Sequence, residues 1–164
     1  MSQEVSVITE QEHVFLQRCL ALAKEALAAG DEPFGSVLVN EAGEILKEDR
    51  NRIAGGDATL HPEFELARWA ANNMSPEQRA KATVYTSGEH CPMCAAAHAW
   101  VGLGRIVYIS SSKQLRQWRE EMGLGPLPVS PIPVEEIAPF VEVVGPVSPY
   151  DNEVYALHQA RHRS

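Results

Sequence analysis

Apolar side chains recur at helical spacing between residues 10 and 29. They line up on one stripe as Phe15, Cys19, Leu22 and Ala26. Thr9 and Glu12 have the spacing of a capping box, in which each side chain bonds the backbone N–H of the other residue. Gly30 follows as a residue suited to ending a helix. The pattern predicts an amphipathic first helix that buries Cys19 in a core.

Beyond this helix, short runs rich in apolar and β-branched residues alternate with helical patterns. Strands are predicted at residues 34–40, 45–50, 82–86, 105–110 and 140–144. Helices are predicted at residues 62–72, 92–101, 112–121 and 151–161. A short turn joins the first two strands into a hairpin, whereas helices separate most of the later strands. This order predicts an α/β sheet with parallel crossovers, and the Gly- and Pro-rich residues 123–133 are expected to form a structured loop.

Composition restricts the class of protein. The 164 residues suit one domain, and 45% hydrophobic residues are enough for a core. The net charge of −8 argues against a broad nucleic-acid surface, because such surfaces need Lys and Arg to displace counterions. No apolar stretch is long enough to cross a bilayer, and the polar residues 1–12 do not resemble a signal peptide. We therefore expect one domain over residues 1–164 of a cytoplasmic protein, without a membrane or nucleic-acid partner.

Two short motifs carry the candidate chemistry. A His-x-Glu at residues 61–63 and a Cys-x-x-Cys at residues 91–94 each open a predicted helix. Cysteines three residues apart lie on one helix face, and a helix N-terminus favours thiolates. A histidine would be the third ligand, and three protein ligands leave the fourth position of zinc open, as in catalytic sites. The sequence predicts one zinc ion per chain, held by His61, Cys91 and Cys94.

Glu63 is the candidate for proton transfer. One neutral imidazole and two thiolates cancel the 2+ charge of zinc, so this ion would acidify water less than an ion held by three histidines. A base is then needed, and Glu63 stands two residues beyond His61 on the first helical turn. We expect Glu63 to accept a proton from the attacking water and to pass protons to a ring nitrogen and a leaving amine, so that ammonia departs.

The cysteine pair alone is compatible with two further roles. A redox pair would follow a strand in a thioredoxin-like pattern and would not need the His-x-Glu motif. A structural zinc site would need a fourth ligand, for which His90 and His98 are the candidates. A non-catalytic, zinc-stabilised binding domain therefore predicts a closed metal site, whereas an enzyme predicts an open one.

Together the motifs resemble the cytidine and deoxycytidylate deaminase superfamily, whose signature is His-x-Glu followed by Pro-Cys-x-x-Cys. The resemblance extends over about residues 34–109 and is strongest to the branch of guanine deaminases, nucleoside deaminases and transfer-RNA adenosine deaminases. The residues that carry it further are 33–39, Asn51 and 57–59. It implies a three-layer α-β-α fold with a central mixed five-stranded sheet, together with the roles given above to the zinc ligands and to Glu63.

The same resemblance implies contacts with a substrate. Asn51 would hold the ring through an amide that donates and accepts hydrogen bonds, unless it is a turn residue bonded to its own backbone. Phe34 would wall the pocket or else belong to the core. The C-terminal segment of guanine deaminases can cover an active site, sometimes that of a partner subunit. Residues 123–164, with Tyr150, are candidates for that part beside a core of about residues 10–122, and a homodimer is expected.

Three positions depart from the family pattern. His90 stands where proline is usual, and Pro62 stands where alanine is commoner. Residues 111–113 read Ser-Ser-Lys, whereas related enzymes often carry an aspartate near this place. In guanine deaminases an acidic residue contacts the base, so its absence weakens guanine as the specific substrate.

The activity favoured by the sequence is zinc-dependent hydrolytic deamination of a small purine-like base or nucleoside, of guanine type, with release of ammonia. A transfer-RNA adenosine deaminase is one alternative, and the net charge of −8 counts against it. A cytosine- or cytidine-type deaminase is another. The non-catalytic zinc-stabilised binding domain is the third.

Overall fold

Five strands form one mixed sheet at the centre of the molecule. The computed structural model describes residues 8–162, so residues 1–7 of the polar N-terminal stretch and residues 163–164 lie outside the described part. The strands are β1 (Gly35–Val39), β2 (Ile45–Arg50), β3 (Thr83–Gly88), β4 (Ile106–Ser110) and β5 (Val143–Val144). Their order is β2-β1-β3-β4-β5. β1 pairs antiparallel with β2 and β3, whereas β3–β4 and β4–β5 are parallel, which confirms the predicted mixed five-stranded sheet.

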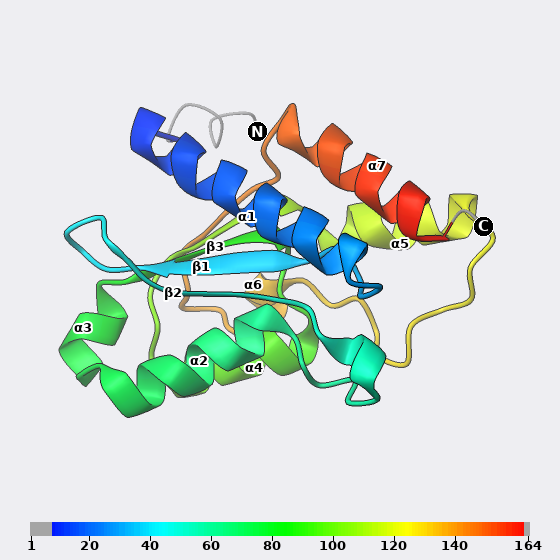
Figure 1. Cartoon of the computed structure of the whole chain (residues 1–164). Coiled ribbons are helices and arrows are strands. Elements are labelled where there is room, and N and C mark those ends of the chain that lie inside the picture. The colour runs from blue at the N-terminus through cyan, green and yellow to red at the C-terminus, as the bar shows by residue number, and fades with distance from the viewer. Residues whose placement is uncertain (1–7, 163–164) are drawn as a thin grey trace.

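Helices cover both faces of this sheet and complete three layers (Figure 1). One face carries α1 (Glu10–Ala28), α5 (Ser112–Glu121) and α7 (Tyr150–His162). The other face carries α2 (Pro62–Asn73) and α4 (Pro92–Trp100), with α6 (Val134–Ile137) packed against α4. The three-layer α-β-α architecture expected from the resemblance is therefore confirmed.

The first helix follows the prediction closely. Both bonds of the capping box are present, between the Thr9 side chain and the Glu12 N–H and between the Glu12 side chain and the Thr9 N–H. Cys19 is fully buried, as predicted. The helix lies so close to β1 that a Cβ on Gly35 would come within 2.4 Å of the Leu22 Cβ, so only glycine fits there.

Three hydrophobic cores fill the spaces between the layers, and the smallest of them, between β4, α4 and α6, includes Ile106, Tyr108 and Val134. The core under α1 and α7 includes Phe15, Leu16, Val37, Val107, Ile109, Trp118 and Val154. The core between the sheet and the α2–α4 pair includes Leu38, Leu66, Ala67, Ala70, Val84 and Leu103. Because each core holds a helix layer on the sheet, the N-termini of α2 and α4 are placed firmly relative to the strand ends.

One edge of the sheet collects the candidate site residues. β2 and β3 run in the same direction and β1 runs against them, so the ends of β2 and β3 meet the start of β1 at this edge. Asn51 directly follows β2, Phe34 directly precedes β1, and residues 89–91 directly follow β3. Residues from three distant parts of the chain therefore converge here.

Several boundaries differ from the prediction. β3 extends to Gly88, two residues beyond its predicted end, and β5 has only two residues, with Phe140 outside it and fully exposed. The short helices η2 (Ile53–Gly55), α3 (Pro76–Ala80) and α6 were not predicted. Each has five residues or fewer, which is too short for a hydrophobic period to show.

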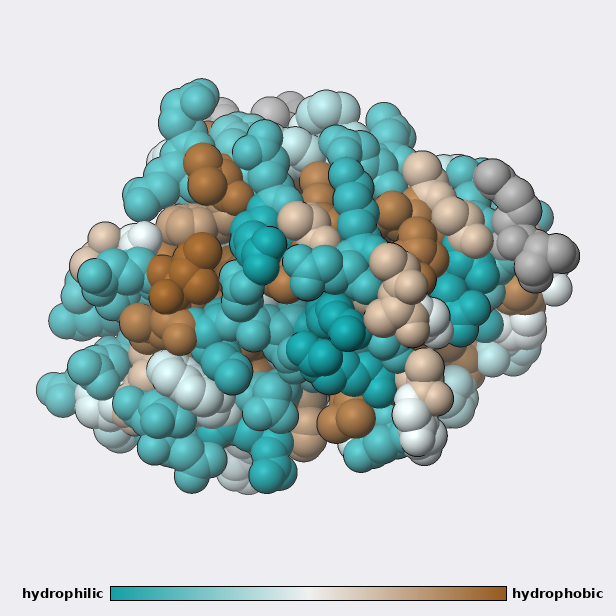
Figure 2. All heavy atoms as spheres, in the orientation of Figure 1, coloured by the Kyte–Doolittle hydropathy of each residue, from teal (hydrophilic) through white to brown (hydrophobic). Residues whose placement is uncertain are grey.

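The C-terminal segment divides between the two faces. Residues 124–133 contain no helix or strand, as the loop prediction requires, and the segment then places α6 against α4. In contrast, α7 packs against α1 and β4 on the opposite face. Within the described residues, no helix is both long and apolar enough to cross a membrane. The face shown in Figure 2 is mainly hydrophilic, with its hydrophobic side chains in separate patches.

His158 of α7 makes stability sensitive to acid. Its imidazole is buried between the rings of Phe34 and Trp118, and burial, followed by the charges of His162 and Arg119, lowers its pKa to about 4. Below about pH 6.5 the unfolded chain binds a proton that the folded chain excludes, so this residue should cost about 1.4 kcal/mol of unfolding free energy per pH unit down to about pH 4. His158→Gln should give a shallower decline in urea denaturation over this range. An unchanged slope would contradict the burial argument.

Candidate active site

His61 stands at the N-terminus of α2, directly before Pro62. Proline suits the first helical turn because its missing N–H would have no helical partner there. The preceding turn is held by Asp57, whose Oδ1 accepts from the Thr59 N–H at 2.9 Å and from the Thr59 hydroxyl at 2.6 Å. The Thr59 carbonyl then accepts the His61 N–H at 2.8 Å, so local bonds orient the imidazole.

Cys91 is the N-cap residue of α4 and Cys94 stands on its first turn. The His61 Nδ1 lies 3.6 Å from each of the two Sγ atoms. All three donor atoms lie within 4.8 Å of one another, a spacing that one tetrahedral ion can bridge. The structure thus brings together the three predicted ligands, although 30 residues separate His61 from Cys91.

No fourth protein donor joins this group within residues 8–162. His90 is fully buried, and neither of its ring nitrogens has a hydrogen-bond partner in the described part of the chain. Its ring packs edge-to-face on His98 with the centroids 5.2 Å apart, and the His98 Nε2 bonds the Gly104 carbonyl at 2.7 Å. Neither histidine closes the metal site, so the arrangement is that of an open, three-ligand centre.

The charges of the donor set fit a divalent cation. A hydrogen bond from Cys94 lowers the pKa of the Cys91 thiol to about 4. The same hydrogen bond between the two cysteines, together with burial, raises the pKa of the Cys94 thiol, because a second thiolate would be repelled by the first. A bound dication removes this repulsion, and both sulfurs can then be thiolates. Nitrogen and thiolate donors at this spacing fit zinc.

Glu63 lies one helical position beyond Pro62, and its side chain is turned into the protein. It is 5% exposed, and its Oε1 has no hydrogen-bond partner among residues 8–162. Burial raises its pKa to about 7, and nearby His61 opposes that shift. A buried carboxyl with an unpaired oxygen can take up and give back a proton at neutral pH.

Asn51 and Phe34 lie at the same sheet edge. The Asn51 N–H donates to the Phe34 carbonyl at 3.0 Å, and the Arg52 N–H donates to the Leu60 carbonyl at 3.1 Å, which places this loop next to His61. The Phe34 ring contacts Gly88, where a Cβ would come within 2.9 Å of it. It also packs on His158, so Phe34 belongs partly to the core as well as to the site edge.

Tyr150 is placed elsewhere. It is the first residue of α7, and its hydroxyl bonds the His13 Nδ1 of α1 at 3.0 Å. Both helices lie on the sheet face opposite α2 and α4 (Figure 1). The structure therefore does not bring Tyr150 to the candidate site of its own chain, because the Tyr150 ring packs on the core under α1 and α7.

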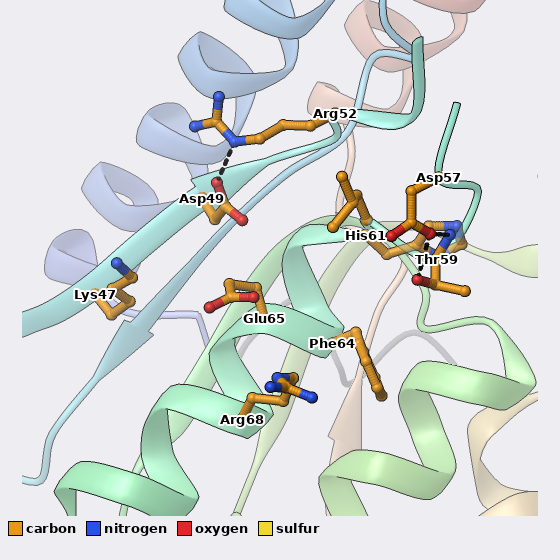
Figure 3. A pocket seen from close by; sticks show the side chains of 10 residues that line it. Lys47, Asp49, Arg52, Asp57, Thr59, His61, Phe64, Glu65 and Arg68 are labelled. Carbon is orange, nitrogen blue, oxygen red and sulfur yellow. Dashed lines mark hydrogen bonds and ion pairs between the residues drawn. The ribbon is translucent and has the colours of Figure 1, made fainter. Parts of the chain in front are cut away.

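A groove of about 510 Å³ runs beside His61, between β2 and α2. Figure 3 shows its charged side chains facing one another from the two elements and the connecting loop. The basic residues are Lys47, Arg52 and Arg68, and the acidic residues are Asp49, Asp57 and Glu65. Opposite charges are thus matched along the groove, and Glu63, Asn51 and the cysteines do not line it.

Sequence patterns did not indicate Asp31, Arg50 or Glu89. The Glu89 carboxylate accepts the N–H of Ser112 at 2.8 Å and of Val134 at 2.9 Å, so it ties the starts of α5 and α6 to the loop that leads to Cys91. The only sequence signal for Glu89 was its place beside the cysteine motif. Its partners are 23 and 45 residues away and become evident only in the fold.

Comparison with known proteins identifies the family of this chain. Residues 9–110 match the family model of the cytidine and deoxycytidylate deaminase zinc-binding region. The chain belongs to this family. It is a zinc-dependent deaminase. The matched region contains the triad of His61, Cys91 and Cys94, together with Glu63 and Asn51.

Relatives of this deaminase are named for several substrates. It is 27% identical to a probable cytosine deaminase of Schizosaccharomyces pombe over 82% of this chain and 88% of that protein. It is 35% identical to guanine deaminase of Bacillus subtilis over 57% of this chain and 61% of that protein. It is 34% identical to the tRNA-specific adenosine deaminase of Haemophilus influenzae over 64% of this chain and 61% of that protein.

The fold of this deaminase also matches solved structures. The structure of guanine deaminase from Nitrosomonas europaea superposes with a TM-score of 0.68 over 99% of this chain and 91% of that chain. The sequences are 19% identical, so the match is one of fold.

Proposed function

We propose that this chain hydrolytically deaminates a small purine-like base or nucleoside, of guanine type, and releases ammonia. One observation carries the proposal: an open His-Cys-Cys donor set stands at one sheet edge beside a buried carboxyl, one oxygen of which has no partner among residues 8–162. In this proposal His61, Cys91 and Cys94 hold one zinc ion, and Glu63 moves protons. Such an open site with a dedicated carboxyl is the arrangement of hydrolytic zinc enzymes.

The residues of the chain divide the reaction between them. A zinc ion bound to the triad supplies the Lewis acidity that makes water a nucleophile at neutral pH. Glu63 accepts a proton from the attacking water and holds it on its carboxyl. It passes this proton to the ring nitrogen, then takes the remaining proton of the added hydroxyl and gives it to the amine. Water adds to the amino-bearing carbon, the C–N bond breaks, and the products are the ring carbonyl and ammonia.

Asn51 and Phe34 would contact the ring. Asn51 is 2% exposed and lies beside Phe34 at the edge where the loop returns to His61. The Oδ1 of Asn51 accepts the Ile53 N–H at 3.1 Å, so this oxygen makes the local backbone bond of a turn residue. The Nδ2 has no hydrogen bond within the described residues, which leaves it free to donate to a ring acceptor.

The relative named as a tRNA-specific adenosine deaminase raises the alternative of an RNA substrate. RNA binding would require basic side chains not already neutralised by carboxylates. The groove beside His61 matches three basic residues with three acidic ones, and the whole chain carries −8. These charges favour a small-molecule substrate.

Cytosine or a cytosine compound is the second candidate substrate. The relative named as a probable cytosine deaminase aligns over 82% of this chain, which is more than the alignments with the guanine and tRNA deaminases cover. Cytosine also presents ring acceptors to an amide donor.

The assembly we propose is a homodimer. Any cover over the site from residues 123–164 would then come from the part before α6 or from the partner subunit.

A substrate panel tests the proposed function. Ammonia release should be measured with zinc-loaded protein on guanine, guanosine, adenine, cytosine, cytidine, pterins, aminotriazines and a transfer RNA. We expect kcat/KM for a purine to exceed that for cytosine at least tenfold, which corresponds to about 1.4 kcal/mol of transition-state preference. A preference for cytosine would establish the second candidate. Turnover of the transfer RNA alone, or no turnover at all, would contradict the proposal.

A further inference from the structure

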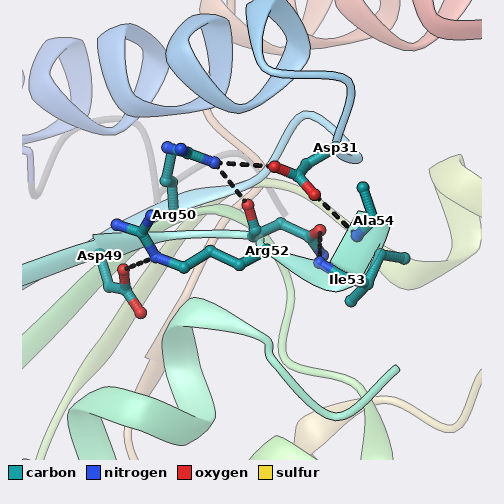
Figure 4. A network of polar contacts seen from close by, with 7 residues as sticks. Asp31, Asp49, Arg50, Arg52, Ile53 and Ala54 are labelled. Carbon is teal, nitrogen blue, oxygen red and sulfur yellow. Dashed lines mark hydrogen bonds and ion pairs between the residues drawn. The ribbon is translucent and has the colours of Figure 1, made fainter. Parts of the chain in front are cut away.

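A buried ion pair lies behind Asn51. Asp31 follows α1 and is 6% exposed, and its Oδ2 accepts from the Arg50 guanidinium at 2.9 Å. The other oxygen of Asp31, Oδ1, accepts the Ala54 N–H at 2.8 Å. One carboxylate therefore joins the last residue of β2 to the short helix η2 that follows it (Figure 4).

The same guanidinium reaches the backbone of Asn51. The Arg50 Nη1 donates to the Asn51 carbonyl at 3.0 Å as well as to Asp31. The Asn51 N–H donates to the Phe34 carbonyl, and its Oδ1 accepts the Ile53 N–H. The carbonyl, the N–H and the Oδ1 of Asn51 therefore each have a fixed partner. The bonds of the carbonyl and of Oδ1 depend on the loop that Asp31 and Arg50 hold.

This arrangement decides which end of the amide is available. An NH2 group facing the Ile53 N–H would set two donors against each other, so the oxygen must face Ile53. The Nδ2 consequently points away from the turn as a donor. A ring bound beside Asn51 must then present an acceptor there, such as an unprotonated ring nitrogen or a carbonyl oxygen.

We propose that Asp31 and Arg50 are positioning residues that hold Asn51 so that its Nδ2 donates to the substrate ring. This inference rests on the proposed function, because it assigns to Asn51 a substrate contact. Without the Asp31 carboxylate the η2 turn loses its bond to Ala54 and Arg50 loses its anchor. The Asn51 amide then rotates away from the geometry in which it meets the ring.

A neighbouring ion pair provides the matched control. Arg18 and Glu48 form a pair at 2.5 Å from α1 to the same strand β2, two residues before Arg50. Their side chains are 37% and 36% exposed, compared with 19% and 8% for Arg50 and Asp31, and neither contacts Asn51 in the described structure. Glu48→Gln therefore removes one charge of an α1–β2 pair without disturbing the Asn51 loop.

The test is a double-mutant cycle on the zinc-loaded enzyme. Asp31→Asn and Arg50→Gln should each lower kcat/KM about ten- to hundredfold with zinc content unchanged, and Arg50→Lys should recover part of the loss. Because both residues act through Asn51, Asp31→Asn combined with Asn51→Ala should be no slower than Asn51→Ala alone. Glu48→Gln should match the wild type. The proposal would be overturned if the losses in kcat/KM of Asp31→Asn and Asn51→Ala multiplied in the double variant. Equal kinetics of Asp31→Asn and Glu48→Gln would also overturn it.

A second readout does not depend on turnover. The side-chain amide signal of Asn51 in a ¹⁵N-correlated NMR spectrum can be assigned by its loss in Asn51→Ala. We expect it to shift or broaden in Asp31→Asn and to stay in place in Glu48→Gln. An unmoved signal in Asp31→Asn would overturn the positioning role even if no substrate were turned over. Absence of turnover in the wild type with a moved signal would contradict only the proposed function.

Discussion

Glu63→Gln should reduce kcat by a factor of about 10² to 10⁴, the usual contribution of a positioned acid–base group, and leave zinc content unchanged. Glutamine keeps the size of the side chain but cannot carry a proton between water, ring nitrogen and amine. The carboxyl is 5% exposed, with one oxygen unpaired, so bulk water cannot readily replace it. KM should change little, because the proton transfers occur after the ring has bound.

Glu65→Gln is the matched control for this experiment. Glu65 stands two residues further along α2, is only half-buried and lines the outer groove rather than the metal site. It should retain wild-type turnover. Thermal unfolding and metal analysis of both variants would show that folding and zinc binding are intact. Substantial residual turnover in Glu63→Gln would exclude the proposed role.

Cys91→Ser should remove the metal and with it the activity. Wild-type protein should contain about one zinc per chain, as expected for a single three-ligand site, and the variant should contain close to none after dialysis. A serine hydroxyl is not ionised at neutral pH, so it cannot supply the negative charge that the Cys91 thiolate contributes. Metal analysis by mass spectrometry, with kcat measured on the same samples, gives the result.

Cys19→Ala provides the comparison that isolates position from residue type. Cys19 is fully buried in α1 and does not belong to the donor group. This variant should retain zinc and turnover, with a lower free energy of unfolding because a buried sulfur has been removed. If Cys91→Ser still bound zinc tightly, or if Cys19→Ala lost it, the proposed ligand set would be wrong.

The local features of the fold were predictable because they depend on residues close together in the chain. The first helix, its capping box and the β1–β2 hairpin follow from periodicity and turn residues within short windows. The zinc motifs are similarly local, since Cys91 and Cys94 share one helical turn. The helices α3 and α6 escaped prediction because four or five residues carry no period.

The packing of distant segments decided what the sequence left open. The distance between His61 and Cys91, the exclusion of His90 and His98 from the donor group, and the lack of a fourth ligand among the described residues depend on how α2 and α4 pack. Tyr150 was expected near the site, but α7 packs on α1, and the Tyr150 hydroxyl therefore bonds His13. No periodicity in the sequence encodes which face a terminal helix will cover.

By itself, the sequence determined the donor types, the carboxyl at a helix start and the order of strands and helices, because each is a matter of residue identity and short-range spacing. Only the tertiary structure decided that the donor set is open, that the Glu63 carboxyl is buried with an unpaired oxygen, and that Asp31 and Arg50 stand behind Asn51. These properties arise from contacts between segments far apart in the chain or from loss of solvent on packing, and neither is written in any short stretch of the sequence.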